Sequence, residues 1–266
     1  MREDNEQLTS PRLLAPKLPQ FVVPTTPTTA LVKAGSAIHD PDDKRRLALF
    51  DPKTRARAIF IHPRMVRGAP VELALSASLN ALAMAVEGLE SASADAVADA
   101  SLMQALRLIA EHLPALSETP LDEELRGQLV LAAILCGQGT DHAGGGICSV
   151  LGHAIGARFD VANGTVQAIL LPHTMAFNAV ATGKRLRKAL QALGVASQGA
   201  TAAAAIAAVK GLLARLPVPS RLRDVGVTRE SFRDIADEAM RDWFVQRNPR
   251  AIDGSAALVD VLQAAW

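Results

Sequence analysis

Two polar residues four positions apart in an apolar segment are the first candidates for chemistry. Ser149 and His153 follow three consecutive glycines, residues 144–146. If this segment is helical, the spacing places both side chains on one helix face. Such a pair is compatible with a metal site, a nucleophilic dyad, or a histidine acting alone as an acid or base near neutral pH. It is also compatible with a histidine that is only hydrogen-bonded in the core.

The residue types around the pair argue against the first two sites. Serine is a poor metal ligand, and no Asp or Glu recurs at a matching spacing. A nucleophilic serine is typical of a Gly-x-Ser-x-Gly turn with an orienting acid, and neither is evident here. We therefore favour His153 as a general acid or base.

Further polar residues interrupt apolar segments and need hydrogen-bonding partners. Asn80 and Met84 are four residues apart in one such segment, His142 precedes the three glycines, Asn163 lies in a loop, and His173 follows a proline. We expect these side chains to meet one another across a pocket.

The composition favours a helical protein. Of the 266 residues, 49% are apolar and 3% aromatic, alanine is abundant, and the net charge is +1. The balanced charge gives no reason to expect a nucleic acid or a membrane surface as partner. Cys136 and Cys148 form no CxxC motif, which favours a reduced, cytoplasmic setting. Neither a signal peptide nor a membrane-spanning run is evident.

The order of patterns predicts three regions: a tail over residues 1–19, a small β-hairpin region over residues 20–62, and an α-helical domain over residues 63–266. Turn signals such as Asp-Pro separate short apolar runs in the second region. In the third, apolar residues recur at helical spacing. The predicted helices are residues 71–89, 95–113, 121–137, 147–157, 165–181, 183–193, 201–216, 229–245 and 255–266. Gly137 and Gly139 are expected to mark the end of the third helix, and Thr228 is expected to be an N-cap. The fold class is therefore mainly α, a helical bundle.

Several segments resemble, in order, the iron-containing alcohol dehydrogenase superfamily and its maleylacetate reductase branch. Residues 78–87, SLNALAMAVE, are similar to the family's D/N-A-L-A-H-x-x-E helix. Residues 149–156, SVLGHAIG, are similar to its H-x-x-x-H-x-x-G. LLPH at residues 170–173 and NPR at residues 248–250 also match. The resemblance covers residues 20–266 and implies the C-terminal helical domain of this dehydroquinate synthase-like fold.

The resemblance also implies what differs in this chain. The family binds a divalent ion through one Asp and three His, and the matching positions here are Asn80, Met84, Ser149 and Asn163. Because none of these offers a negative charge or an imidazole, we expect no metal. The family's nucleotide-binding domain has no counterpart in this sequence, so we expect no nicotinamide cofactor. His153 matches the second family histidine, which lines the active-site cleft.

These points predict a truncated, metal-independent relative that binds a small carbonyl or carboxylate compound. It would act by acid–base chemistry as a lyase, isomerase, decarboxylase or hydrolase. The predicted catalytic residues are His153, His142 and Ser149, and the predicted substrate-binding residues are Asn80, Met84, Asn163 and His173. The alternatives are one half of a split reductase, whose nucleotide-binding partner chain docks on residues 24–61, and a non-catalytic subunit. A homo-oligomer is also possible.

Overall fold

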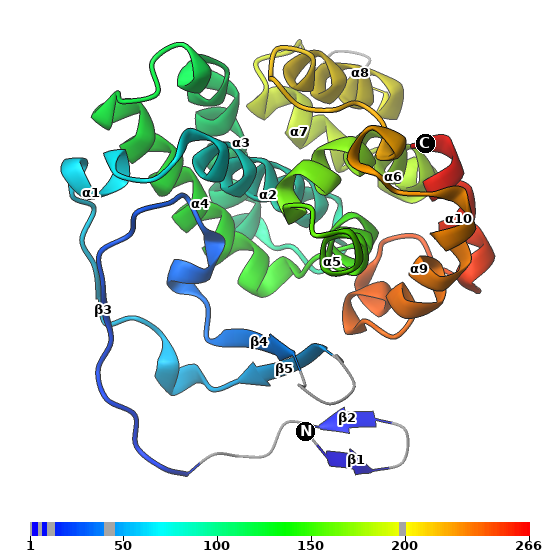
Figure 1. The fold of residues 1–266 in the computed structure, drawn as a ribbon, viewed down its shortest axis with the longest axis horizontal. Helices are drawn as coiled ribbons and strands as arrows, with labels where there is room; N and C mark the ends of the chain where they lie inside the picture. Colours follow the sequence, from blue (N-terminus) through cyan, green and yellow to red (C-terminus); the bar gives the residue numbers. More distant parts are fainter. Residues whose placement is uncertain (1, 5–6, 10–13, 40–45, 197–200) are drawn as a thin grey trace.

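The computed structural model describes residues 2–4, 7–9, 14–39, 46–196 and 201–266, and it confirms the helical fold class (Figure 1). The α-helices are α1 (Pro63–Arg67), α2 (Val71–Glu90), α3 (Ala96–His112), α4 (Glu123–Ala143), α5 (Ile147–Phe159), α6 (Asn163–Thr182), α7 (Leu186–Ala192), α8 (Ala202–Leu213), α9 (Phe232–Ala239) and α10 (Ser255–Ala264). Short 3-10 helices lie between several of them.

Helix α2 forms the centre of the bundle and packs against α3, α4 and α6. Its many alanines and glycine let the neighbouring helices approach closely: a Cβ atom at Gly88 would lie 2.7 Å from the Leu102 side chain. By length and composition α2 is the one helix among the described residues that would also suit a membrane span. However, 61% of that apolar window is buried inside the fold, as befits a core helix.

The β region contains two separate strand pairs. Strands β4 (Gly35–His39) and β5 (Arg46–Phe50) form the expected antiparallel hairpin. Strands β3 (Phe21–Val22) and β6 (Ala58–Ile59) pair in parallel, so they are not part of a hairpin. A small apolar cluster of Leu31, Val66 and Val130 joins this region to α1 and α4.

The segment predicted to be a tail also contains two strands. Strands β1 (Arg2–Asp4) and β2 (Gln7–Thr9) pair antiparallel. Three-residue polar strands carry no apolar alternation, so the pattern gave no signal for them.

The largest errors in the predicted helices concern two segments, residues 121–137 and 229–245. The helix predicted over residues 121–137 continues to Ala143. Gly137 and Gly139 do not end this helix; they allow close packing, because a Cβ atom at either would lie 2.5 Å from a neighbour, the Thr29 carbonyl oxygen and the Leu102 side chain respectively.

The helix predicted over residues 229–245 is broken into three. A 3-10 turn, η5 (Arg229–Ser231), precedes α9, and another, η6 (Trp243–Arg247), follows it. Thr228 occupies the N-cap position of η5 but makes no side-chain cap bond. The Asp242 side chain instead caps η6 by accepting a hydrogen bond of 3.0 Å from the Phe244 backbone N–H.

Candidate functional site

His153 has an acidic partner that the sequence did not reveal. On α5, its Nδ1 lies 3.7 Å from Oδ2 of Asp242, and the two side chains are 19% and 16% exposed. This is an ion-pair distance, longer than a hydrogen bond. Because Oδ1 of the same carboxylate accepts the Phe244 N–H, the orientation of Asp242 is fixed. Asp242 is therefore an acid that can orient His153, and the sequence analysis missed it because it lies within residues 229–245, which were predicted as one helix.

Ser149 is hydrogen-bonded to the buried carboxyl group of Glu87 on α2. Its Oγ donates to Glu87 Oε2 at 2.5 Å, and its backbone N–H donates to Oε1 at 3.0 Å. Burial raises the pKa of Glu87, and the bonds from Ser149 oppose that rise. A Cβ atom at Gly146 would lie 3.0 Å from Glu87 Oε1, so the glycines let α5 begin directly beside this acid.

Asn80 and Met84 contact each other, as expected of positions one helical turn apart. Asn80 Nδ2 lies 3.5 Å from the Met84 sulfur. The same sulfur accepts a contact of 3.6 Å from Thr29 Oγ1, which belongs to the 3-10 helix η1 (Thr29–Val32). Met84 is buried, and Asn80 is partly exposed.

The prediction that Asn163 lies in a loop is wrong: it is the first residue of α6, at the point where that helix meets α2. A Cβ atom at Gly156 would lie 2.1 Å from Asn163 Oδ1, so the amide fills the space that this glycine leaves. A Cβ atom at Gly164 would lie 1.8 Å from the Ser76 carbonyl oxygen and 2.9 Å from the Asn80 backbone nitrogen. The start of α6 is therefore pressed against α2 beside Asn80.

The four positions expected from the resemblance to match the family's metal ligands thus all adjoin α2, but their donors do not fit a divalent ion. The amide of Asn80 is engaged with the thioether of Met84, and the hydroxyl of Ser149 with Glu87. Thioethers are soft ligands, and the set brings neither charge nor imidazole. Within the described ranges no group of three or more His, Cys, Asp or Glu could hold a metal ion.

The other two predicted histidines have partners outside the predicted set. His142, at the end of α4, is 71% exposed, and its Nε2 lies 3.6 Å from Asp95. His173 on α6 is partly buried beside Lys210 of α8, and burial, with that lysine, lowers its pKa. The contacts in the structure do not join either histidine to the predicted group.

A second buried acid, Glu90, lies one turn beyond Glu87 on α2. Its Oε2 accepts a hydrogen bond of 3.1 Å from Asn178 Nδ2, and its Oε1 has no partner. Asn178 and Asn248 exchange amide hydrogen bonds of 3.1 and 2.8 Å. Burial raises the pKa of Glu90 to about 8, so this acid is largely protonated near neutral pH. Two acids on an otherwise apolar helix were a signal that sequence reasoning did not use.

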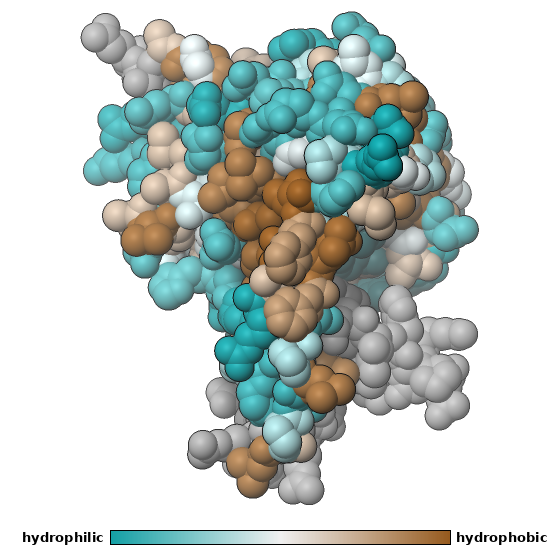
Figure 2. Space-filling model, turned by 90° about the vertical axis from the view of Figure 1, so that its left-hand side faces the viewer, coloured by the Kyte–Doolittle hydropathy of each residue, from teal (hydrophilic) through white to brown (hydrophobic). Residues whose placement is uncertain are grey.

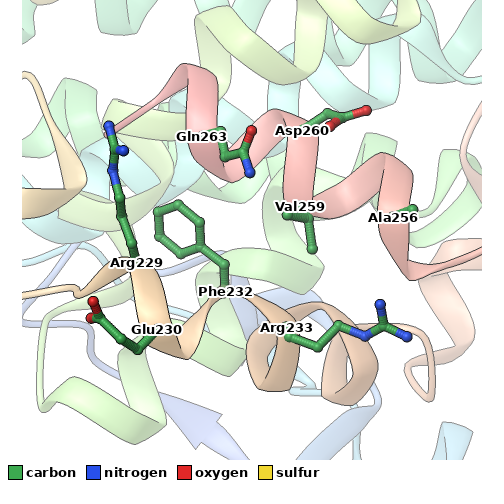
Figure 3. Close-up of a pocket in the computed structure, with 8 residues that line it drawn as sticks. All are labelled: Arg229, Glu230, Phe232, Arg233, Ala256, Val259, Asp260 and Gln263. Carbon is green, nitrogen blue, oxygen red and sulfur yellow. The ribbon is translucent and has the colours of Figure 1, made fainter.

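A surface groove of about 430 Å³ lies elsewhere, between η5, α9 and α10. Figure 3 shows Arg229 and Arg233 toward its two ends with Phe232 between them. The groove is lined by Arg229, Glu230, Phe232, Arg233, Ala256, Val259, Asp260 and Gln263. None of these is a predicted site residue.

The sequence was compared with models of known protein families. The family described as "Fe-containing alcohol dehydrogenase family, C-terminal" matches residues 74–266 of this chain. This chain belongs to that family. It is 31% identical over 259 residues to lactaldehyde reductase of Escherichia coli (strain K12), covering 94% of this chain and 66% of that protein. It is 27% identical over 239 residues to maleylacetate reductase 1 of Cupriavidus pinatubonensis, covering 90% of this chain and 64% of that protein.

The solved structure of an alcohol dehydrogenase from Oenococcus oeni has the same fold, with a TM-score of 0.92 at 23% identity. It covers 99% of this chain and 71% of that chain. The family expected from the motifs is therefore confirmed, as an Fe-containing alcohol dehydrogenase relative. The chain spans about two thirds of the length of the curated relatives it matches, 66% and 64% for the two reductases.

Proposed function

We propose that this family member, which resembles the maleylacetate reductase branch, catalyses a metal-free and nicotinamide-free acid–base reaction. Its substrate is a small carbonyl or carboxylate compound, and the reaction is of the lyase, isomerase, decarboxylase or hydrolase type. The observation that supports this is the approach of Asp242 Oδ2 to His153 Nδ1 at 3.7 Å. A half-buried histidine beside a fixed carboxylate is a common arrangement for a general base.

Asp242 gives the two ring nitrogens of His153 different roles. A carboxylate near Nδ1 favours the tautomer with the proton on Nδ1. Nε2, on the other side of the ring, is then the atom that takes a proton from the substrate and returns it. Asp242 acts as a positioning residue in this scheme.

Asn80 and Asn163 are suited to bind the oxygens of the substrate. The Asn80 amide is 3.5 Å from a thioether sulfur, which is a weak acceptor. Exchanging that contact for a bond to a carbonyl or carboxylate oxygen costs little, whereas freeing Ser149 from Glu87 would leave a buried acid without its partner. Ser149 therefore supports the site through Glu87, and the amides provide the donors.

The test compares turnover of a panel of oxo acids and lactones by the wild type and variants. We expect His153→Ala to reduce kcat at least about 100-fold, in line with general acid–base catalysis. Asp242→Asn should reduce kcat and displace the pH profile, whereas His62→Ala, at an exposed position, should change neither. Equal turnover by wild type and His153→Ala would refute the proposal, as would activity that a chelator abolishes and a divalent ion restores.

A second candidate is the substrate half of a split reductase, and the exposed apolar surface of the β region favours it. Figure 2 shows apolar surface gathered on the side of the molecule that carries β3 and α1. The large apolar side chains exposed in this part of the chain include Phe21, Val23, Phe60, Ile61 and Met65. A parallel pair of two-residue strands is also unusual alone, since parallel sheets are normally larger and covered on both faces.

The partner in this second candidate is an α/β chain that binds a nicotinamide nucleotide. Purification of this chain from its native host should then yield a complex that binds NADH and reduces a carbonyl compound. Phe60→Asp should dissociate the complex, because it places a charge in the apolar surface. An assembly that contains only copies of this chain, or a complex that does not bind NADH, would contradict this candidate.

A further inference from the structure

The surface groove between η5, α9 and α10 shares no residue with the site around His153. Its volume of about 430 Å³ is in the size range of pockets that hold small molecules. Phe232 of α9 and Val259 of α10 form its apolar floor, and Ala256 extends that floor along α10 (Figure 3). Because Phe232 is buried between the two helices, the floor is fixed by their packing.

One end of the groove is formed by an arginine whose guanidinium is placed by an aromatic ring. Arg229 Cζ lies over the Trp266 ring, 4.1 Å from its centroid. The ring is itself anchored, because Trp266 Nε1 donates a hydrogen bond of 3.0 Å to the Val227 carbonyl oxygen. The Leu222 N–H, in the 3-10 helix η4 (Leu222–Val225), bonds to the neighbouring Ala265 carbonyl oxygen at 2.9 Å. A guanidinium that is ordered in advance loses less conformational freedom when a ligand binds.

This end of the groove presents hydrogen-bond donors toward the apolar floor. Stacking on an indole uses the face of the Arg229 guanidinium and leaves the N–H groups along its edge directed outward. Figure 3 shows the Gln263 amide of α10 above the Phe232 ring, on the side of the groove that carries Arg229. The neighbouring carboxylate of Glu230 points away from Phe232 in the same view. A cationic group and an amide therefore converge beside an apolar surface.

The opposite end of the groove is different, because its arginine is already paired with an acid. Arg233 Nε donates to Asp237 at 3.2 Å, and the two side chains are 71% and 48% exposed. The Arg233 side chain and the Asp260 carboxylate both extend away from the floor in Figure 3. Since exposed ion pairs are screened by water, this end contributes little to the selection of a charged ligand. Arg229 is the charged group that the surrounding structure orders.

We propose that this groove binds a small organic carboxylate with an apolar body. The carboxylate group accepts hydrogen bonds from Arg229 and Gln263, and the apolar body lies on Phe232, Val259 and Ala256. A neutral amide of the same shape loses the charge-assisted bond to the guanidinium, and a carboxylate without the body loses the apolar contact. The inference is independent of the proposed function, because it uses none of the residues of that site.

The first test compares three ligands of the intact chain by titration calorimetry. Phenylacetate carries both features, phenylacetamide replaces the carboxylate by a neutral amide, and acetate lacks the apolar body. We expect phenylacetate to bind saturably and the other two to bind at least about tenfold more weakly, as the loss of a charged hydrogen bond or of apolar burial predicts. Equal affinity for phenylacetate and phenylacetamide would overturn the proposal, as would the absence of saturable binding of phenylacetate.

The second test applies one substitution at each end of the groove. Arg229→Gln should weaken phenylacetate binding at least about tenfold, whereas Arg233→Gln, the matched control, should leave it within about twofold. Val259→Asp keeps the contact of Arg229 with Trp266 but places a like charge against the ligand, so it should also weaken binding at least about tenfold. Unchanged affinity in Arg229→Gln and Val259→Asp would refute the groove as the site.

The third test locates the ligand, since the proposed substrate of the His153 site is also a carbonyl or carboxylate compound. Trp243 and Trp266 are the two tryptophans of the chain, so Trp243→Phe leaves Trp266 as the single fluorescent indole. Phenylacetate should change its emission with the affinity found by calorimetry, and Asn80→Ala should bind phenylacetate as the wild type does. Binding that Asn80→Ala abolishes, or that leaves the Trp266 emission unchanged, would place the ligand elsewhere and overturn the proposal.

Discussion

In the helical body, residues 63–266, the large apolar side chains of α2 and α3 are closed off from water: Leu82, Leu106 and Ile109 have no exposed surface. In the β region that precedes it, Phe21 is 63% exposed and Phe60 is 56% exposed. Both regions bury polar side chains, but of different kinds. The body buries the acids Glu87 and Glu90 inside a helix, whereas the β region buries Thr29 and Asp51 beside short strands.

The contrast indicates that the helical body and the β region have different roles. Tight packing in the body fixes the orientation of Glu87 and of His153 on α5, which is what acid–base chemistry requires. The β region is joined to the body by η1, by the cluster of Leu31, Val66 and Val130, and by the ion pair of Arg55 with Asp141. If this division is correct, changes in the body should cost far more stability than changes in the β region.

The largest effect is expected at the junction of α6 and α2. Gly164→Ala places a Cβ atom 1.8 Å from the Ser76 carbonyl oxygen, and backbone cannot move aside as a flexible side chain does. We expect the free energy of unfolding to fall by about 4 kcal/mol or more, enough to abolish folding in many single domains. Chemical denaturation, or the soluble yield where the variant does not fold, measures this.

Gly127→Ala is the matched control within the body. A Cβ atom at Gly127 of α4 meets nothing within 4 Å. The same substitution should therefore raise the free energy of unfolding by about 0.5–1 kcal/mol, because alanine has the higher helix propensity. Equal effects of the two substitutions would show that α6 can move off α2 at little cost.

The second prediction compares the two regions directly. Leu106→Ala creates a cavity in the closed core, and we expect it to cost about 2–5 kcal/mol. Phe60→Ser removes an aromatic ring that is already half in water, so it should change the free energy of unfolding by less than about 0.5 kcal/mol. A large cost for Phe60→Ser, measured by the same denaturant titration, would mean that the β region has a core of its own.

The helical body was largely predictable from the sequence because its signal is periodic. The helix expected over residues 71–89 is α2, which ends at Glu90, and the helix expected over residues 255–266 is α10. The glycines of α4 misled the prediction, since the sequence cannot distinguish a glycine that ends a helix from one that allows close packing. The contacts of Gly137 and Gly139 are with residues distant in sequence.

The candidate site was predictable only in part, for a similar reason. The spacing of Asn80 with Met84, which places their side chains in contact, could be read from the local sequence. The partner of His153 could not, because Asp242 becomes available only where the predicted helix breaks at η6.

The smallest effect is expected from Glu90→Gln, which tests whether the body really holds a protonated acid. The folded chain keeps a proton on Glu90 until about pH 8, whereas the unfolded chain releases it near pH 4.5. The contribution of this acid to stability is therefore complete below pH 4.5 and is lost progressively as the pH rises to about 8. Glutamine keeps an oxygen to accept the Asn178 amide but has no proton to release.

The variant should consequently be more stable than the wild type by about 1–3 kcal/mol at pH 8 and nearly equal to it at pH 4.5. Glu111→Gln, at a position 55% exposed on α3, should show no such difference between the two pH values. Because burial also raises the pKa of Glu87, the variant retains part of the wild type's decline with pH. Parallel stability curves for the variant and the wild type would mean that Glu90 is ionised in the fold, and the body would then have to supply it with a cationic partner or with water.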